Sequence, residues 1–176
     1  ETERPDDGSA DFQVAYDEDY LYIAAHVTDD DVRVDARDVI WNQDFVSVII
    51  NGAPLMESAM NKGMGWYRES FILNMTPQTG NSPGATHYEN RYEGLNFQYA
   101  CEVTGKGYRM EFALPLSYLR ERQGNDWRTA RINLLIQDSD SGEREKPRHT
   151  WQPDWRGAGN RVGSGMFFKE KRESDR

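Results

Sequence analysis

Short runs in which apolar and polar residues alternate are the feature that most restricts how this chain can fold. They recur about every eight to twelve positions between turn residues, a pattern typical of all-β domains. Residues 12–16 and 21–27 both alternate in this way, on either side of Asp17-Glu18-Asp19. Because successive side chains of a strand point to opposite faces, each run buries one face. Together the two runs predict a β-hairpin.

The rest of the chain continues this pattern. Residues 45–50 are almost all apolar, as expected for a strand that is covered on both faces. Further strands are predicted at residues 70–75, 96–103, 108–114, 130–137 and 165–169. Pro115 ends one of them, and a helical turn is predicted at residues 116–119. The elements predict one all-β domain, with a polar leader at residues 1–11 and a charged tail at residues 170–176.

Two long loops, residues 51–69 and the polar residues 138–161, interrupt the strands and are expected to be functional or disordered. The first contains Met56, Met60 and Met64, which are spaced as on one face of a helix. Either a short helix packs this face under the loop, or the thioethers bind copper(I). The packed helix is the interpretation that we favour.

Composition narrows the possible partners. The chain has 176 residues, with 21 Lys+Arg against 30 Asp+Glu, and a net charge of −9. This charge disfavours nucleic acids and other polyanions, and no apolar stretch is long enough for a membrane helix. Aromatic residues make up 12% of the chain, and they supply the core that its few aliphatic residues do not. The single cysteine, Cys101, excludes an internal disulfide and is predicted to pack as a small apolar residue.

The sequence contains no standard catalytic motif. Its three histidines, His26, His87 and His149, lack a metal-ligand spacing, and no serine lies in a Gly-x-Ser-x-Gly elbow. The glycine loops that cradle phosphates are also missing. We expect His26 to be a packed or surface residue of its strand. The residues alone thus do not support catalysis, and we expect a protein that is not an enzyme.

Acidic clusters directly follow two of the predicted strands, Asp29-Asp30-Asp31 in one place and Asp138-Ser139-Asp140 in the other. Carboxylates that close strand ends into loops can collect the several oxygen ligands that calcium prefers, although the spacing is not that of an EF-hand. The alternative is that both clusters are solvated acidic loop tips.

The tryptophans lie in or beside predicted loops more than at alternating core positions. They are Trp41, Trp66, Trp127, Trp151 and Trp155. An exposed indole beside Asp, Asn or Arg suits sugar binding, because the apolar face of a pyranose stacks on the ring while its hydroxyls need polar partners. For each tryptophan taken alone, packing in the core is the alternative.

Several motifs follow one another in a recognisable order. They are Val14-Ala15-Tyr16-Asp17-Glu18-Asp19-Tyr20-Leu21-Tyr22-Ile23, then Val27-Thr28-Asp29, Trp41-Asn42-Gln43-Asp44-Phe45-Val46, Phe71-Ile72-Leu73-Asn74 with Gly80, residues 107–119, Gly124 with Trp127-Arg128, Asn133, Trp151-Gln152-Pro153 and residues 163–168. This order resembles that of family 9 carbohydrate-binding modules over residues 12–169. The resemblance implies a two-sheet antiparallel β-sandwich of the immunoglobulin or jelly-roll kind, bound calcium, and a site in which two tryptophans clamp a sugar.

Carried over by position, Trp41 is the first clamp residue and Trp151 the second, with Trp155 as its substitute. The residues expected to hydrogen-bond the sugar are Asp30, Asn74, Arg148 and Ser47. The expected calcium ligands are Asp29, Asp31, Asp44, Asp138 and Asp140. Two positions depart from the family pattern, because Ser47 and Ile72 stand where an acidic residue and an arginine are common.

The function implied is a non-catalytic module that holds an attached enzyme at a polysaccharide or oligosaccharide, at a chain end or within it. Such a module would belong to a larger multidomain protein that is secreted, periplasmic or at the cell surface, without nucleic-acid binding or membrane insertion. One alternative is a structural or adhesive β-sandwich that joins larger domains. The other is a redox domain with b-type haem, whose axial ligands would be Met110 with His149 or His87.

Overall fold

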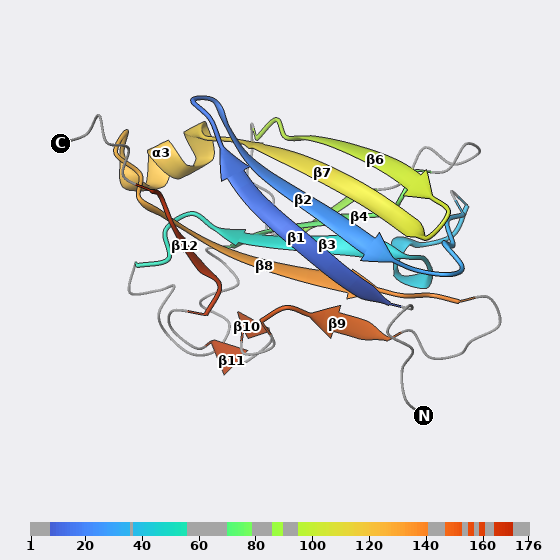
Figure 1. Cartoon of the computed structure of the whole chain (residues 1–176). Helices are drawn as coiled ribbons and strands as arrows, with labels where there is room; N and C mark the ends of the chain where they lie inside the picture. The colour runs from blue at the N-terminus through green and yellow to red at the C-terminus, as the bar shows by residue number, and fades with distance from the viewer. Residues whose placement is uncertain are drawn as a thin grey trace.

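The strands form two antiparallel sheets that pack face to face (Figure 1). The structure is a computed structural model, which describes residues 8–35, 37–55, 70–78, 86–89, 95–140, 147–152, 155–156, 159–160 and 164–170. Both the predicted all-β class and the two-sheet sandwich are confirmed. No helix in this described part of the chain is long and apolar enough to cross a membrane.

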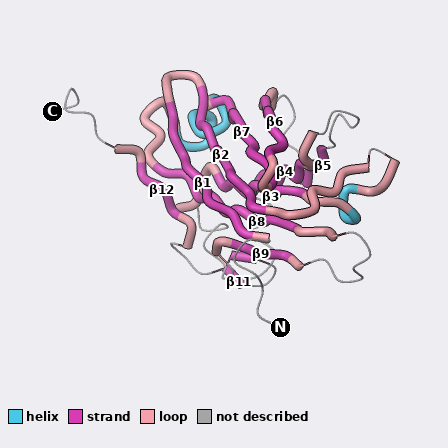
Figure 2. The backbone as a smooth tube through the Cα atoms, turned by 45° about the vertical axis from the view of Figure 1, so that its right-hand side comes forward, coloured by secondary structure: helices cyan, strands magenta, loops and turns pink. Residues whose placement is uncertain are grey.

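The two layers are clearest in Figure 2, where the view is turned by 45°. The four-stranded sheet has the order β1 (Ser9–Tyr16), β2 (Tyr20–Thr28), β7 (Gly107–Pro115), β6 (Gln98–Thr104). The six-stranded sheet has the order β12 (Met166–Phe168), β8 (Thr129–Gln137), β3 (Phe45–Asn51), β4 (Ser70–Met75), β5 (Thr86–Glu89), and β9 (Arg148–Thr150) also pairs with β8. The remaining elements are the pair β10 (Trp155–Arg156) and β11 (Gly159–Asn160), the 3₁₀ turn η1 (Ile40–Asn42) and the helix α3 (Ser117–Gln123).

The N-terminal hairpin forms as its alternation predicts, although β1 begins at Ser9 and so takes in the end of the predicted leader. Asp17 holds the turn, because its Oδ1 accepts the backbone N–H groups of Asp19 and Tyr20, both at 2.8 Å. The hydroxyl of Tyr22 donates to Asp17 Oδ2 at 2.7 Å. This bond keeps the pKa of Asp17 below its ordinary value and raises the pKa of Tyr22 to about 12. The aspartate therefore fixes both the turn and the Tyr22 ring.

The core lies between the sheets and is built by alternate residues of their strands. Its members include Leu21, Ile23, Val27, Val46, Val48, Ile50, Phe71, Leu73, Tyr108, Met110, Phe112, Leu114, Ile132, Leu134 and Ile136. Cys101 packs against this core as predicted. Met110, the residue considered as a haem ligand, is only 2% exposed and is part of the same core.

The helix α3 is joined to the six-stranded sheet by the hydroxyl of Tyr118. This hydroxyl donates to the carbonyl of Ile50 at 3.2 Å and accepts the N–H of Gly52 at 3.3 Å. Tyr118→Phe should therefore leave two buried backbone groups with one partner fewer each, which costs about 1–2 kcal/mol of unfolding free energy. Urea unfolding of both proteins measures this loss. An unchanged midpoint would show that water replaces the hydroxyl.

Two parts of the chain differ from the prediction. The segment predicted as a loop over residues 138–161 contains β9, β10 and β11, and β9 pairs with β8. These strands have only two or three residues, too few for an alternating pattern to be visible in the sequence. The short strand β5 was likewise not predicted. The methionine helix expected at Met56, Met60 and Met64 lies outside the described residues.

Candidate functional site

One face of the six-stranded sheet points away from the other sheet, and we call it the outer face. Ser47 of β3 lies on it, between Asn74 of β4 and Leu135 of β8, and Leu135 in turn pairs with Thr150 of β9. Asn74 Nδ2 and Thr150 Oγ1 are both buried, and within the described part of the chain neither has a hydrogen-bond partner. Buried polar atoms normally have partners. The row of Ser47, Asn74 and Thr150, which we call the polar row, therefore offers unsatisfied polar atoms to a ligand.

Trp41 lies on the same side of this sheet, at the end where β3 begins. Its indole packs edge-on against Phe45, with ring centroids 5.5 Å apart, and remains 37% exposed. The guanidinium of Arg148 lies 6.0 Å from the centre of the Trp41 ring and 5.8 Å from that of Phe45. An exposed indole on an aromatic support, beside a cation with several N–H donors, is suited to stacking and hydrogen-bonding a sugar ring.

Gln137 of β8 connects these groups, although no sequence motif predicted it. Its Nε2 donates to the carbonyl of Trp41 at 3.0 Å and to that of Gln43 at 2.9 Å. Its Oε1 accepts the Nε–H of Arg148 at 2.7 Å. The side chain is almost fully buried. A glutamine directly after the apolar residues Leu134, Leu135 and Ile136 was the only signal for this positioning role.

Trp151 lies on the other side of the sheet. The backbone N–H of Trp151 donates to the carbonyl of Leu134, a residue that faces the core. The next residue, Leu135, faces the other way and packs with Phe45 on the outer face. The indole packs against Phe12 at 4.9 Å and Phe167 at 5.8 Å. Trp41 and Trp151, the two residues expected to form the clamp, therefore lie on opposite sides of the sheet, because successive residues of a strand point to opposite faces.

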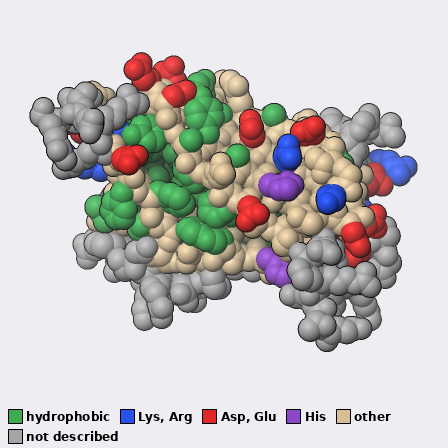
Figure 3. Space-filling view, in the orientation of Figure 1, with side chains coloured by type: hydrophobic (Ala, Val, Ile, Leu, Met, Phe, Trp, Pro, Cys, Tyr) green, Lys and Arg blue, Asp and Glu red, His purple; other side chains and the backbone are tan. Residues whose placement is uncertain are grey.

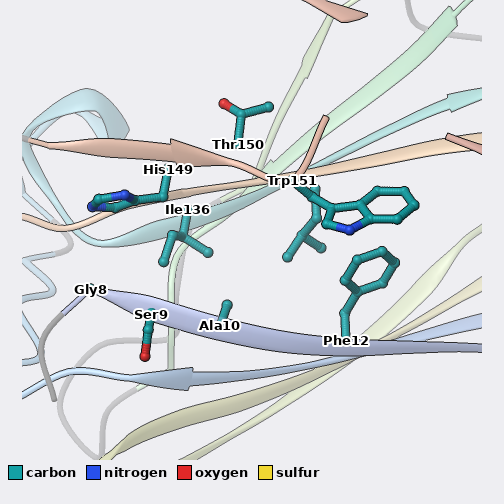
Figure 4. Close-up of a pocket in the computed structure, with 9 residues that line it drawn as sticks. Gly8, Ser9, Ala10, Phe12, Ile136, His149, Thr150 and Trp151 are labelled. Atoms are coloured by element: carbon teal, nitrogen blue, oxygen red, sulfur yellow. The ribbon is translucent and has the colours of Figure 1, made fainter. Parts of the chain in front are cut away.

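Trp151 instead closes one end of a crevice at the open edge of the sandwich (Figure 4). The crevice has a volume of about 260 Å³ and lies between β1 below and β8 and β9 above. Leu134 and Ile136 form its apolar wall, and His149 lies at the end away from the indole. Trp151 is 45% exposed there, so its indole is only partly buried.

Other expected binding residues are spread over the structure. Asp30 follows β2 and is exposed, and its carboxylate groups with those of Asp29 and Asp140 rather than with the polar row. Trp155 lies in β10, and its side chain is outside what the structure describes. One side of the sheet thus carries Trp41, Arg148, Ser47 and Asn74, whereas Asp30 and Trp151 lie elsewhere.

Acidic residues of the two predicted clusters meet in space, together with Asp44. Carboxylate oxygens of Asp29, Asp44 and Asp138 lie within 4.8 Å of one another, and all three residues are buried. Those of Asp29, Asp30 and Asp140 form a second such group toward the surface. Asp31, also expected as a ligand, is in neither group, but its N–H donates to Asp29 Oδ1 at 2.9 Å.

Asp44 is held at the centre of this arrangement by backbone groups. Its two carboxylate oxygens accept the N–H groups of Arg33 and of Ser139, the latter at 2.7 Å. Burial raises the pKa of Asp44 to about 8, and the charges of Asp29 and Asp138 add to the shift. Burial, with the charges of Asp44 and Asp29, also raises the pKa of Tyr108 well above its ordinary value. A cation bound by these oxygens would offset the carboxylate charges that help to raise the pKa values of Asp44 and Tyr108. Carboxylate oxygens are also the ligands that calcium prefers, so this group of residues fits calcium.

Known proteins with a similar sequence pattern or fold include carbohydrate-binding modules of family 9. The family model described as "Carbohydrate family 9 binding domain-like" matches residues 1–160. The fold is similar to a family 9 carbohydrate-binding module from Caldicellulosiruptor kristjanssonii in complex with cellotriose, with a TM-score of 0.65 and 16% identity over 94% of this chain and 77% of that one. A structure of such a module from the same organism with glucose gives a TM-score of 0.64 and 17% identity over 93% and 78% of the two chains. No curated protein sequence matches.

Proposed function

Because the chain belongs to the carbohydrate family 9 binding domain-like family, we propose that it is a non-catalytic module that binds an oligosaccharide or a polysaccharide segment. The similar structures were determined with cellotriose and with glucose, so gluco-oligosaccharides are the first ligands to test. The net charge of −9 favours a neutral glycan over an anionic one.

The exposed indole of Trp41 is the observation that carries this proposal. A pyranose would stack on it while Arg148, already held by Gln137, donates to the sugar hydroxyls. Asn74 and Ser47, on the same side of the sheet, would extend the polar contacts along the glycan. Trp155 remains the candidate for a second aromatic contact.

In a longer protein the module would hold an attached enzyme close to its polysaccharide. Binding of this kind raises the effective concentration of the enzyme at the substrate and needs no catalytic group in the module itself. The corresponding location is outside the cytoplasm, in a secreted, periplasmic or cell-surface protein. This part of the proposal is tested by fusing the module to a glycanase and measuring hydrolysis of insoluble against soluble substrate.

Trp41→Ala should weaken binding of cellotriose or cellohexaose by at least about 30-fold, since a central aromatic contact of this kind is worth about 2 kcal/mol or more. Isothermal titration calorimetry measures the change, and thermal melting verifies the fold of the variant. Phe168→Ala is the matched control, because Phe168 is an aromatic residue that is 73% exposed at a distant strand.

Trp151→Ala distinguishes a site built on Trp41 from one in which Trp41 and Trp151 clamp the sugar. Since Trp151 packs on Phe12 and Phe167, its loss should lower the melting temperature and leave the affinity within about twofold. If Trp41→Ala binds as the wild type does, or if no neutral glycan binds at all, the proposal is wrong and a structural or joining role takes its place.

We also propose that the module binds calcium through Asp29, Asp44 and Asp138, with Asp30 and Asp140 nearer the surface. The three buried carboxylates come from the end of β2, the start of β3 and the end of β8. An ion there would join the two sheets, because β2 belongs to one and β3 and β8 to the other. Its role would be structural.

A further inference from the structure

The four-stranded sheet carries a groove on the face that points away from the core, and no part of the proposal above uses it. The groove has a volume of about 540 Å³. Ala24 of β2 forms its floor, and the register places Gln13 of β1 and Glu111 of β7 on either side of Ala24. A methyl side chain between two long ones leaves a hollow along the strand. We call it the β2 groove.

Polar side chains of both hydrogen-bonding kinds surround the β2 groove. His26 lies two residues from Ala24 on the same face of β2, between Asp11 of β1 and Arg109 of β7. Figure 3 shows this mixture, with acidic, basic and histidine side chains together beside a hydrophobic area. Arg109 and His26 supply donors, whereas the carboxylate of Asp11 supplies acceptors.

These side chains are not used by the fold. Within the described part of the chain, none of Asp11, Gln13, His26, Arg109 and Glu111 forms a side-chain hydrogen bond or ion pair. Arg109 also stands opposite Glu102 of β6 without an ion pair to it. Donors and acceptors that converge on a hollow and are not paired with one another are available to a ligand.

An aromatic surface continues the β2 groove along the same strand. Tyr20 and Tyr22 lie on the same face of β2 as Ala24, because their positions differ by an even number. Their ring centroids are 6.0 Å apart, and Tyr22 is 38% exposed. The bond to Asp17 holds the Tyr22 ring in place. From Tyr20 to His26 the strip is about 20 Å long, at the usual rise per strand residue.

We propose that the β2 groove, together with Tyr20 and Tyr22, is a second glycan-binding surface, on the sheet opposite the Trp41 surface. Its ligand is an uncharged, hydroxyl-rich saccharide segment. Aromatic faces stack on sugar rings, and a mixture of donors and acceptors matches hydroxyl groups, which are both. The carboxylates of Asp11, Glu111 and nearby Glu102 repel sulfated or uronic acid polymers, which would require donors alone. Two surfaces on opposite sheets allow one module to bridge two glycan chains.

The test uses Trp41→Ala as background, so that the two surfaces are measured separately. Cellohexaose, xylohexaose, mannohexaose and a soluble β-1,3-glucan are titrated into it and followed by amide chemical shifts. We expect shifts at Ala24, His26 and Arg109 for at least one of them. In the Trp41→Ala background, Tyr22→Ala and Arg109→Ala should each reduce affinity for that glycan about tenfold.

Matched variants make the result specific. Phe168→Ala and Arg128→Ala remove an exposed aromatic and an exposed arginine that do not line the β2 groove, and they should leave binding there unchanged. Ala24→Arg fills the floor at a partly exposed position, so it should abolish binding there without removing a core residue. If the β2 groove variants retain full affinity, or if no glycan shifts its amides, this proposal is overturned. Loss in these variants with no effect of Trp41→Ala would instead overturn the proposed role of Trp41.

Discussion

Gly107→Ala is expected to destabilise the domain by about 4 kcal/mol and to lower its melting temperature by about 10 °C. Gly107 has φ of 118°, a conformation that residues with a Cβ rarely adopt. A Cβ built there would also lie 2.1 Å from the carbonyl oxygen of Val27 and 2.8 Å from the nitrogen of Asp29. Both contacts are with backbone, so no side chain can move aside, and β2 or β7 must shift.

Gly105→Ala is the matched control, because it lies in the same turn between β6 and β7. Nothing lies within 4 Å of the position of its Cβ. Its expected effect is within about 0.5 kcal/mol. Differential scanning calorimetry of the two variants and the wild type measures the contrast. Equal melting temperatures for the two variants would contradict the close approach of β7 to Val27.

The turn between β6 and β7 also positions part of the acidic site. The N–H of Asp29 donates to the carbonyl of Lys106 at 3.3 Å, and Gly107 pairs with Thr28, the last residue of β2. The chain that carries Asp29 is therefore held between the end of β2 and this turn. A displacement caused by a Cβ at Gly107 would move the carboxylate of Asp29 relative to Asp44 and Asp138.

The fold could be predicted from the sequence wherever strands were long enough to alternate. Residues 70–75 coincide with β4, and the predicted strand at residues 130–137 differs from β8 by one residue. The alternation in residues 21–27 predicts which side chains of β2 are buried. Strand β9 was missed because Arg148–Thr150 has no apolar residue, and only its pairing with β8 makes it a strand.

The site was less predictable, because it depends on which face of the sheet each residue occupies. Trp151 and Arg148 are three residues apart, and the sequence places both beside the same loop. The register Gln137↔Arg148 directs Arg148 to the side of Trp41, so Trp151 falls on the core side. Such a register depends on long-range pairing with β8. The acidic cluster was predicted better, since Asp29, Asp44 and Asp138 all lie directly at strand ends, where the topology brings them together.

Calcium is expected to raise the melting temperature by about 10 °C when its concentration is a thousand times its Kd, which corresponds to about 4 kcal/mol of unfolding free energy. The reason is the group of Asp29, Asp44 and Asp138, whose oxygens lie within 4.8 Å of one another. Two charges at such a separation repel by about 3 kcal/mol at an effective dielectric constant of about 20. Without a cation, burial favours the protonated form of Asp44 and raises its pKa to about 8, and the charges of Asp29 and Asp138 add to this shift.

Calorimetry in calcium chloride and in EDTA measures this effect, with magnesium chloride as the comparison, because magnesium gives up its water ligands reluctantly. Asp138→Asn keeps the size of a buried cluster residue and removes its charge, so it should reduce the calcium-dependent gain by more than half. Asp126→Asn changes an exposed acid outside the cluster and should keep the full gain. Equal melting temperatures of the wild type in calcium and EDTA would mean that protons alone neutralise the cluster. A gain in calcium that Asp138→Asn retains in full would place the ion elsewhere in the module.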